Sequence, residues 1–294
     1  MAGIGRHGAQ ARRRGRCLDE ADNVSWQYAL RHAQLPSGAL LAKEGSMTNP
    51  LIQKLEYGAN LTDDHRRILE RTSQKRRQVP RKEHLIREGE RPSCVRLVME
   101  GFACRYKLLP TGERQIMAFL VPGDFCDLHV AILGRMDHSI VTLSPCTIVD
   151  IPRETIMDLT DNHPAITRAL WWATLVDQAV LREWIVGLGQ RPAETRIAHL
   201  LCELTTRLAA VGRVTDGAFD LPITQEEFAD TLGLSIVHTN HMLMNLRDKD
   251  LATVQNKRAI IHDFEQLMRF ADFTPDYLHL SDRSGVDQVN RNSA

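Results

Sequence analysis

Short polar and aliphatic side chains with the chemistry to read DNA are concentrated between Ile223 and Arg247. Amide and imidazole groups can hydrogen-bond base edges in the major groove, and Ile or Val can contact thymine methyl groups. We expect phosphate contacts from Thr224 and Ser235, and an exposed helix end with base-facing residues after them, namely Ile236, Val237, Thr239, Asn240 and His241. An ordinary helical hairpin inside a core is the alternative interpretation of this segment.

Two helices joined by a tight turn would hold these side chains at the protein surface. Thr224 and Glu227 have the types and the spacing of a capping box, which starts the first helix. Gly233 can take the left-handed conformation that ends this helix, and Ser235 can cap the second one. We expect the apolar side chains of the second helix to lie broadly on one face, namely Val237, Met242, Leu243 and Leu246.

A β-hairpin is expected soon after the second helix. The segment ATVQNKRAIIHD contains two short strands around an Asn256-Lys257 turn. Lys257 and Arg258 lie near the tip of this hairpin, where they can contact phosphate. The sequence therefore predicts a winged helix-turn-helix.

This segment resembles the winged helix-turn-helix of the Crp/Fnr superfamily of bacterial regulators. The resemblance rests on the pattern IT-x-E-E-F-A followed by LG-x-S-x-x-x-x-N-x-x-L-x-x-L, whose positions are Ile223, Thr224, Gln225, Glu226, Glu227, Leu232, Gly233, Ser235, Asn240, Leu243 and Leu246. Many members carry a guanine-reading Arg where this chain has His241, so the resemblance does not extend to that base contact. It covers roughly residues 51–280 and implies a homodimeric regulator of transcription that binds double-stranded DNA, with RNA polymerase as an open candidate partner.

The composition is that of an ordinary globular protein of about two domains. The chain has 294 residues, 37 basic and 37 acidic side chains, and 43% hydrophobic residues. Because the formal net charge is zero, DNA binding must rest on a local patch. Residues 190–262 hold eight Lys or Arg against nine Asp or Glu, which counts against a basic domain, but residues 235–246 contain no acid.

Membrane and cysteine-based functions are not expected. The sequence contains no run of about eighteen apolar residues, so we expect no spanning helix and no membrane partner. The six cysteines form no CxxC pair, and only Cys17 lies near the N-terminus. This cysteine pattern fits a reducing compartment, so we expect a cytoplasmic protein. Fnr-type members hold an iron–sulfur cluster with an N-terminal cysteine cluster, so we do not expect that cofactor here.

Both ends of the chain are expected to be disordered. Residues 1–46 are rich in arginine and lack the apolar segment of a secretory signal. Met47 begins a segment that is similar to the start of shorter relatives, so our hypothesis is that translation starts there; a basic arm that contacts DNA phosphates is the alternative. Residues 281–294 form a polar tail without core residues.

Residues 78–151 alternate between apolar and polar side chains in short runs, with Gly or Pro turns about every ten residues. This pattern predicts an antiparallel roll or barrel. The segments LVMEGFACRYKLLPTGERQI and FLVPGDF resemble the cyclic-nucleotide-binding roll of the same superfamily. The predicted fold class is α+β, with a sensor roll in residues 47–162, a long dimerisation helix and hinge in 163–189, and the winged helix-turn-helix in 190–280.

The resemblance also gives candidate effector residues in the roll. In members that bind cyclic nucleotide, a Gly-Glu pair after PGDF holds the ribose, and an Arg-Ser pair holds the cyclic phosphate. The corresponding positions here are Asp127, Leu128, His138 and Ser139, so only the serine is retained. A buried phosphate needs a permanent cation, and Asp127 would repel it, so we do not expect cyclic AMP to be the effector.

Metal-dependent functions have weak support in the same region. His129 and His138, with Cys126 and Asp127 nearby, have irregular ligand spacing, and we expect the roll to bury them without a metal. A cupin-type metalloenzyme would need a His-x-His pair, and residues 80–150 contain none. No catalytic arrangement stands out, so we do not expect an enzyme. A protein-interaction module that does not bind DNA is a further alternative.

A long helix is predicted from His163 to Gly187, with two apolar stripes. A helix that flanks a roll needs one apolar face, so a second stripe implies a partner. The first stripe is Ile166, Leu170, Ala173, Val180 and Trp184; the second is Trp171, Leu175, Leu181 and Ile185. We expect a coiled-coil-like homodimer through the first stripe, with its burial inside one chain as the alternative.

Two further expectations concern the same helix. Asp177 interrupts the first stripe and is expected to be solvated or paired across the dimer axis. Gly187, Gly189 and Pro192 are expected to break the helix and to form the hinge between the domains.

Overall fold

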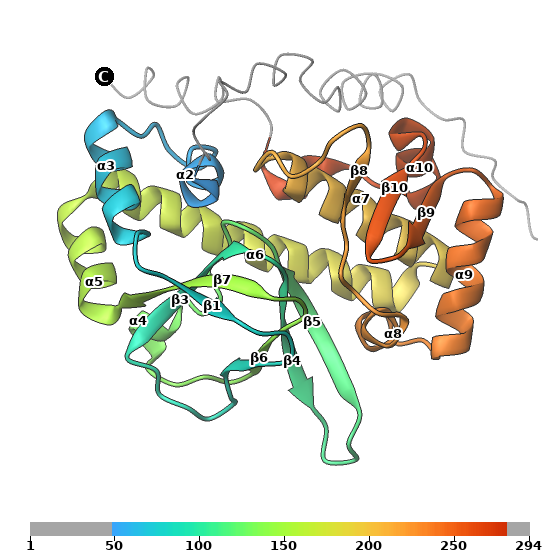
Figure 1. The fold of residues 1–294 in the computed structure, drawn as a ribbon, viewed down its shortest axis with the longest axis horizontal. Coiled ribbons are helices and arrows are strands. Elements are labelled where there is room, and N and C mark those ends of the chain that lie inside the picture. Colours follow the sequence, from blue (N-terminus) through green and yellow to red (C-terminus); the bar gives the residue numbers. More distant parts are fainter. Residues whose placement is uncertain (1–48, 281–294) are drawn as a thin grey trace, which may run out of the picture.

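The computed structural model describes residues 49–280, in which a β-roll and a smaller helical domain share one long helix, α6 (Pro164–Gln190) (Figure 1). The predictions for residues 1–46 and 281–294 lie outside the described residues. Among the residues described, no helix is long and apolar enough to cross a lipid bilayer.

The roll consists of two antiparallel sheets, as the alternating sequence predicts. One sheet has the strand order β1-β7-β3, and the other has the order β2-β6-β4-β5. The strands are β1 (Arg76–Val79), β2 (His84–Ile86), β3 (Cys94–Glu100), β4 (Ala103–Leu108), β5 (Arg114–Leu120), β6 (Ser139–Thr142) and β7 (Cys146–Pro152). At Gly101, which ends β3, φ is +83°, and a Cβ atom would lie 2.3 Å from the Pro145 carbonyl oxygen. The turn therefore requires glycine.

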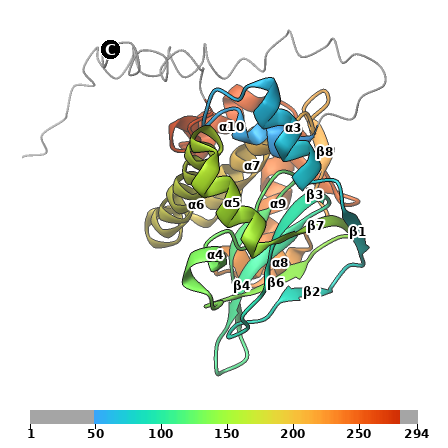
Figure 2. The same cartoon turned by 90° about the vertical axis from the view of Figure 1, so that its left-hand side faces the viewer.

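Short helices surround the roll and fix it to α6. They are α2 (Pro50–Leu55), α3 (Asp63–Thr72), α4 (Val130–Leu133) and α5 (Arg153–Asn162). Figure 2 shows α5 and α6 together on one side of the strands. Leu51, Leu55 and Leu69 from the first two helices are almost fully buried and belong to the same core cluster as the roll strands.

The long helix does not break at its glycines. Helix α6 runs through Gly187 and Gly189 and ends at Arg191, whose ψ of 141° is extended. An interior glycine weakens a helix by only about 1 kcal/mol relative to alanine. Pro192 excludes the helical conformation from the residue before it. The predicted hinge is therefore wrong at both glycines and correct at the proline.

The predicted dimer stripe faces the interior of this chain. Leu170, Ala173 and Val180 are 2%, 5% and 5% exposed, and they pack against the roll and the helical domain. Trp184 is half-buried and lies edge-on to Phe119 at 5.8 Å between ring centroids. Assignment of these residues to the dimer contact is therefore wrong, because the roll and the next helix cover them.

The opposite side of α6 carries the exposed apolar residues. Trp171 is 69% exposed, and Leu175 and Ile185 are 58% and 62% exposed. Asp177 pairs within the chain, since its carboxylate lies 2.9 Å from the guanidinium of Arg105 on β4. Both expectations for Asp177, a solvated gap or a pair across a dimer axis, are therefore wrong.

The helical domain follows α6 directly. Its elements are α7 (Ala193–Ala209), β8 (Ala218–Asp220), α8 (Gln225–Leu232), α9 (Ile236–Asp248), β9 (Ala252–Gln255), β10 (Arg258–Ile261), α10 (Phe264–Ala271) and the short 3-10 helix η1 (Pro275–Leu278). The strands form one antiparallel sheet of order β8-β10-β9. Helix α7 supplies the centre of this domain, because Ile197, Leu201 and Leu204 on it are completely buried.

A buried ion network joins the roll to the helical domain. Arg207 on α7 lies 2.7 Å from Asp124 in the roll and 3.0 Å from Glu203 on its own helix. Lys54 on α2 pairs with the other carboxylate oxygen of Asp124. Burial alone would raise the pKa of Asp124, but Lys54 and Arg207 hold it below its usual value.

Glu203 extends this network to α6 and to the C-terminal end. Its carboxylate accepts hydrogen bonds from Trp184 Nε1 at 2.9 Å and from the Tyr277 hydroxyl at 3.1 Å. Burial raises the pKa of Glu203, although Arg207 and both hydrogen bonds act in the opposite direction. The charged side chains of Lys54, Asp124, Glu203 and Arg207 thus form one buried network in which each charge is compensated by its neighbours.

Removal of the Arg207 guanidinium should destabilise the whole fold. Arg207→Met leaves two carboxylates buried without this cation, and we expect the free energy of unfolding to fall by about 3–5 kcal/mol. Urea denaturation followed by circular dichroism measures the loss. The matched control is Arg67→Met, which removes an exposed pair with Asp64 at 2.5 Å and should cost at most about 0.5 kcal/mol. Equal losses in the two variants would contradict the role of the network.

Candidate nucleic-acid interface

Local capping interactions form the helix-turn-helix as the sequence predicts. The Thr224 hydroxyl accepts a hydrogen bond from Glu227 N at 3.2 Å, and the Glu227 carboxylate accepts one from Thr224 N at 2.7 Å. Gly233 has φ +62° and ψ +42°, the left-handed conformation that ends α8. The Ser235 hydroxyl then accepts from His238 N at 3.2 Å and starts α9. These caps fix the angle at which α9 leaves the turn.

The first turns of α9 present four of the predicted base-facing residues to solvent. Ile236 is 48% exposed, Val237 is 80% exposed, and Asn240 and His241 are also exposed. Val237 therefore does not lie on the apolar face with Leu243, which is buried. Its position fits the predicted base contact instead.

Thr239 is placed wrongly by the sequence prediction. Its exposure is 0%, and it shares a helix face with Leu243 and Leu246, which pack into the core. Residues three or four positions apart lie on the same side of a helix, so the core that holds these leucines also covers Thr239. A DNA contact by the Thr239 side chain is incompatible with this position.

Gln225 contacts the exposed end of α9, a role that the sequence analysis missed. Its side-chain amide donates to Asn240 Oδ1 at 2.8 Å. Gln225 is the first residue of α8, and the crossing of α8 and α9 brings it beside the first turns of α9. The contact restricts the Asn240 side chain before any DNA is bound. In the sequence, the only feature that could have indicated this contact is a polar residue directly after the Thr224 cap.

The predicted wing is present beside α9. Strands β9 and β10 pair in register from Ala252 to Ile261, and the turn residues Asn256 and Lys257 have φ of 52° and 59°. Positive φ at both central residues is typical of a type I′ hairpin. Lys257 and Arg258 are exposed and form no ion pair within residues 49–280. They are free to meet a phosphate backbone.

The two cations at the C-terminal end of α9 are already engaged. Lys249 lies 2.6 Å from Glu194 and 4.6 Å from the centre of the Phe270 ring. Arg247 lies 3.6 Å from Asp248. Of the cations on α9 and the wing, Lys257 and Arg258 are thus the ones left for DNA.

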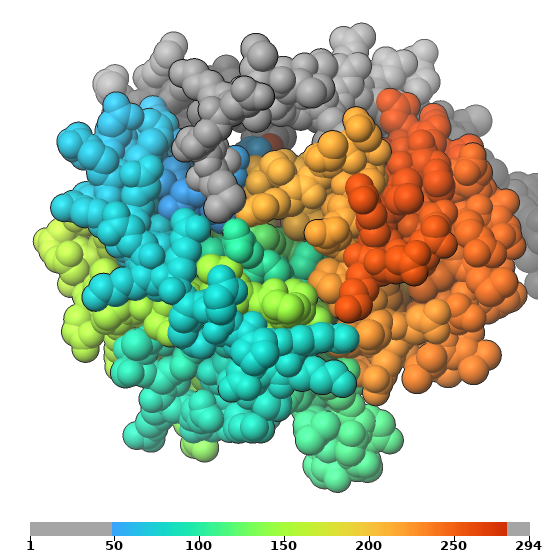
Figure 3. All heavy atoms as spheres, viewed as in Figure 1, coloured from blue at the N-terminus to red at the C-terminus, as the bar shows by residue number. Residues whose placement is uncertain are grey.

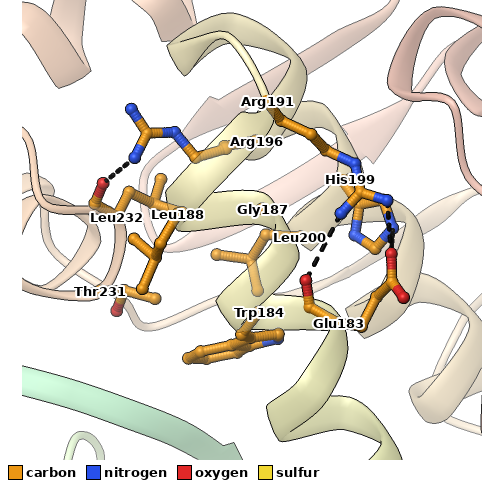
Figure 4. Close-up of a pocket in the computed structure, with 10 residues that line it drawn as sticks. All are labelled: Glu183, Trp184, Gly187, Leu188, Arg191, Arg196, His199, Leu200, Thr231 and Leu232. Atoms are coloured by element: carbon orange, nitrogen blue, oxygen red, sulfur yellow. Dashed lines mark hydrogen bonds and ion pairs between the residues drawn. The ribbon is translucent and has the colours of Figure 1, made fainter.

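The junction between α6 and α7 lies against the end of α8. Figure 4 shows Arg196 directed at the carbonyl oxygen of Leu232, and this hydrogen bond is 2.7 Å long. In the same view Arg191 reaches back to Glu183. The cavity between these residues measures only about 30 Å³, which is water-sized. We interpret this region as a structural joint that positions α8.

The roll contacts α8 directly through three polar pairs. Arg114 on β5 lies 2.7 Å from Asp230, and the Gln115 amide donates to the Thr231 carbonyl oxygen at 3.1 Å. Arg81 lies 3.3 Å from Glu227, the residue that closes the α8 capping box. Figure 3 shows the atoms of the two domains in contact. The orientation of α8 thus depends on the roll as well as on α7.

A cleft also separates the wing from the roll. Its volume is about 520 Å³, and both domains line it: Gly101, Phe102 and Ser144 come from the roll, and Arg213, Asn256 and Lys257 come from the helical domain. The wing tip therefore lies close to the roll in this conformation.

The predicted effector residues are occupied by contacts within the roll. Asp127 is completely buried, and its carboxylate accepts a hydrogen bond from Arg96 N at 2.7 Å and lies 3.3 Å from the Arg96 guanidinium. Burial raises the pKa of Asp127 to about 6, although Arg96 opposes this shift. The Ser139 hydroxyl accepts from Glu88 N at 3.0 Å. His138 is 7% exposed, whereas Leu128 is half-buried.

The two domains each match a known domain family. Residues 76–163 match the cyclic nucleotide-binding domain, and residues 195–270 match the Crp-like helix-turn-helix domain. The matched ranges contain the roll strands and the elements from α7 to α10 described above.

Known proteins with a similar sequence regulate transcription. The chain is 31% identical over 191 residues to the transcriptional activatory protein AadR of Rhodopseudomonas palustris, covering 65% of this chain and 78% of that protein. It is 29% identical over 196 residues to the transcriptional activator protein FnrL of Cereibacter sphaeroides, covering 64% of this chain and 76% of that protein. Among solved structures, FixK2 from Bradyrhizobium japonicum has a TM-score of 0.61 at 22% identity, covering 67% of this chain and 96% of that chain.

Substitution of Asn240 should separate base contacts from phosphate contacts. Because an amide reads base edges, we expect Asn240→Ala to weaken operator binding by about 1–3 kcal/mol and to leave binding to random DNA nearly unchanged. Fluorescence anisotropy with labelled duplexes at fixed salt measures both affinities. Equal losses on the two DNAs would mean that Asn240 contacts the backbone.

The neighbouring buried residue provides the matched control. Thr239 Oγ1 has no hydrogen-bond partner within the described residues. Thr239→Val keeps the shape of the side chain and removes an unsatisfied group, so operator affinity should change by less than about 0.5 kcal/mol. A larger loss would show that Thr239 reaches DNA after all.

Proposed function

Because the chain belongs to the Crp/Fnr family of transcriptional regulators, we propose that it reads an inverted-repeat DNA operator as a homodimer. The family consists of regulators with a helix-turn-helix DNA-binding domain, and not of enzymes. The observation that carries the proposal is the exposed end of α9, where Val237, Asn240 and His241 project from the core. The wing beside it carries two cations that form no ion pair within residues 49–280.

The second apolar face of α6 supports a homodimer. Its exposed residues recur at alternating intervals of three and four, the spacing of a coiled-coil seam. The exposed positions with this spacing are Arg168, Trp171, Leu175, Gln178, Arg182, Ile185 and Gly189, of which Trp171, Leu175 and Ile185 are large apolar residues. A large apolar face on a long exposed helix indicates a partner, and a second copy of the same helix has the same spacing. The polar residues Gln178 and Arg182 within the seam can fix its register.

Two-fold symmetry determines the expected DNA site. A dimer across this seam has two copies of α9, which can enter successive major grooves about 34 Å apart. Thr224, Ser235, Lys257 and Arg258 are the proposed phosphate contacts. Ile236, Val237, Asn240 and His241 are the proposed base contacts, with a preference at His241 that differs from that of members carrying Arg.

The effector of the roll is proposed to be something other than cyclic AMP. The phosphate of a cyclic nucleotide would meet His138 in place of a permanent cation, with the acidic Asp127 close by in the sequence. Asp127 and the retained Ser139 also hold hydrogen bonds within the roll that a ligand would have to break. Calorimetry should detect no micromolar binding of cyclic AMP to the purified chain. Stoichiometric micromolar binding would overturn this part of the proposal.

Regulation of transcription also implies a partner and a compartment. RNA polymerase is the proposed protein partner, because the relatives AadR and FnrL are named transcriptional activators. A protein that acts on DNA together with polymerase in a bacterial cell works in the cytoplasm, and this is the proposed location.

A charge placed in the α6 seam should separate the dimer. Leu175→Glu and Ile185→Glu would bury a carboxylate against its own symmetry copy, which is strongly unfavourable. We expect a monomer by light scattering at micromolar protein concentration. Leu109→Glu, at a residue that is 50% exposed on the β4–β5 turn, is the matched control and should stay dimeric. A dimer that survives both α6 substitutions must use another surface.

Selection of bound fragments from genomic DNA tests the function as a whole. We expect the recovered fragments to share an inverted repeat whose half-sites are centred about one helical turn apart. The Leu175→Glu variant should recover this repeat much less efficiently, because each half-site alone supplies only part of the contacts. A folded wild-type chain that enriches no DNA sequence would favour the interpretation as a protein-interaction module.

A further inference from the structure

Two histidines and a carboxylate meet at one end of the roll, outside the proposed DNA surface. One donor atom each from His129, Asp137 and His138 lies within 4.8 Å of the others. The two imidazole rings are 5.5 Å apart between centroids. His129 caps the start of α4, whereas His138 directly precedes β6. The irregular sequence spacing that argued against a metal site is therefore overcome by the fold.

Both imidazoles have a nitrogen with no partner. His129 Nε2 and His138 Nε2 are shielded from solvent and accept no hydrogen bond from any described residue. Buried polar atoms are normally satisfied, so two unsatisfied nitrogens in neighbouring rings are available as donors to a ligand. His138 itself is 93% buried, since its exposure is 7%.

Asp137 orients one of the two rings. Its Oδ1 lies 2.6 Å from His138 Nδ1, which leaves Nε2 as the free nitrogen of that ring. Histidines that bind metals commonly donate their other ring N–H to a carboxylate, which fixes the tautomer and makes the ligating nitrogen more basic. Asp137 can act in this way or can turn its carboxylate to the ion itself.

Burial shifts the pKa of both rings toward the neutral form, which is the form that binds metals. Burial lowers the pKa of His129, and Arg105 lowers it further. Burial also lowers the pKa of His138, although the hydrogen bond that its Nδ1–H donates to Asp137 opposes this shift. The positive charge of Arg105 is itself compensated by Asp177 at 2.9 Å, so it does not exclude a second cation.

We infer that His129, His138 and Asp137 form a binding site for a divalent first-row transition metal ion such as Zn²⁺, Co²⁺ or Ni²⁺. Imidazole and carboxylate donors suit these ions, and two histidines with one carboxylate leave a coordination position for water. Metal–nitrogen bonds of about 2.0–2.1 Å would draw the donor atoms together by small rotamer changes. The site does not depend on the proposed DNA contacts.

The site is connected to the long helix through a few contacts. An ion would clamp the start of α4 to the start of β6, near the segment that contains Phe125 and Cys126. Arg105 donates to the carbonyl oxygens of these residues at 2.8 Å and 3.0 Å, and the same guanidinium pairs with Asp177 on α6. The Arg105 side chain thus connects the segment beside the metal site to α6.

Equilibrium dialysis of the full-length chain, prepared without a histidine tag, tests the site. We expect one Zn²⁺ or Co²⁺ ion per protomer, measured by elemental analysis after dialysis at neutral pH. His129→Asn and His138→Asn should each weaken binding at least tenfold, and Asp137→Asn should weaken it about tenfold. His238→Asn, at an exposed histidine on α9, is the matched control and should keep the wild-type affinity. Absence of a stoichiometric ion, or unchanged affinity in both histidine variants, would overturn the inference.

The visible spectrum of the wild-type chain with Co²⁺ provides a test that needs no variant. Ligation by two imidazoles and a carboxylate should give the intense d–d bands of a four- or five-coordinate ion without a thiolate charge-transfer band. A thiolate band, or the weak spectrum of the hydrated ion, would overturn the assignment. Saturating Zn²⁺ should also raise the midpoint of thermal unfolding, because the ion binds only the folded chain.

Discussion

A guanidinium buried between two carboxylates is the interaction on which the arrangement of this molecule depends. Arg207 belongs to the DNA-binding domain, Asp124 belongs to the roll, and Glu203 links both to α6 through Trp184. None of these charges is stable in the interior alone, so the domains must meet in one geometry to satisfy them. The position of α8 and α9 relative to the roll follows from this requirement.

The proposed DNA surface is consequently held from several sides. Caps within the segment fix α8 and α9 to each other, and Arg196 anchors the end of α8 at Leu232. The roll adds polar contacts to the same helix through Arg114 and Gln115. The roll and α8 are therefore joined by ion pairs and hydrogen bonds as well as by the chain through α6 and α7.

The roll has the fold of the cyclic nucleotide-binding domain, but several of its interior polar residues differ from those of members that bind cyclic nucleotide. Asp127 pairs with Arg96, and the buried Arg105 pairs with Asp177 on α6. Two imidazole nitrogens nearby have no hydrogen-bond partner within the part of the chain that the structure describes. The fold of this domain can therefore be kept while its ligand changes. The strands form wherever apolar and polar residues alternate, whereas ligand binding depends on a few side chains inside the roll.

The sequence by itself determined the features that depend on residues close together in the chain. The Thr224 and Ser235 caps, the left-handed Gly233 and the hairpin turn at Asn256 each involve four residues or fewer, so local steric and hydrogen-bonding preferences decide them. Periodicity also gave the α6 helix with two apolar faces, but it could not tell which face the roll covers. Only the tertiary structure decided that, together with the burial of Thr239, the contact of Gln225 with Asn240, and the meeting of His129 with His138. Each of these depends on which distant segment lies opposite a side chain, and that is set by packing of the whole core rather than by local conformation.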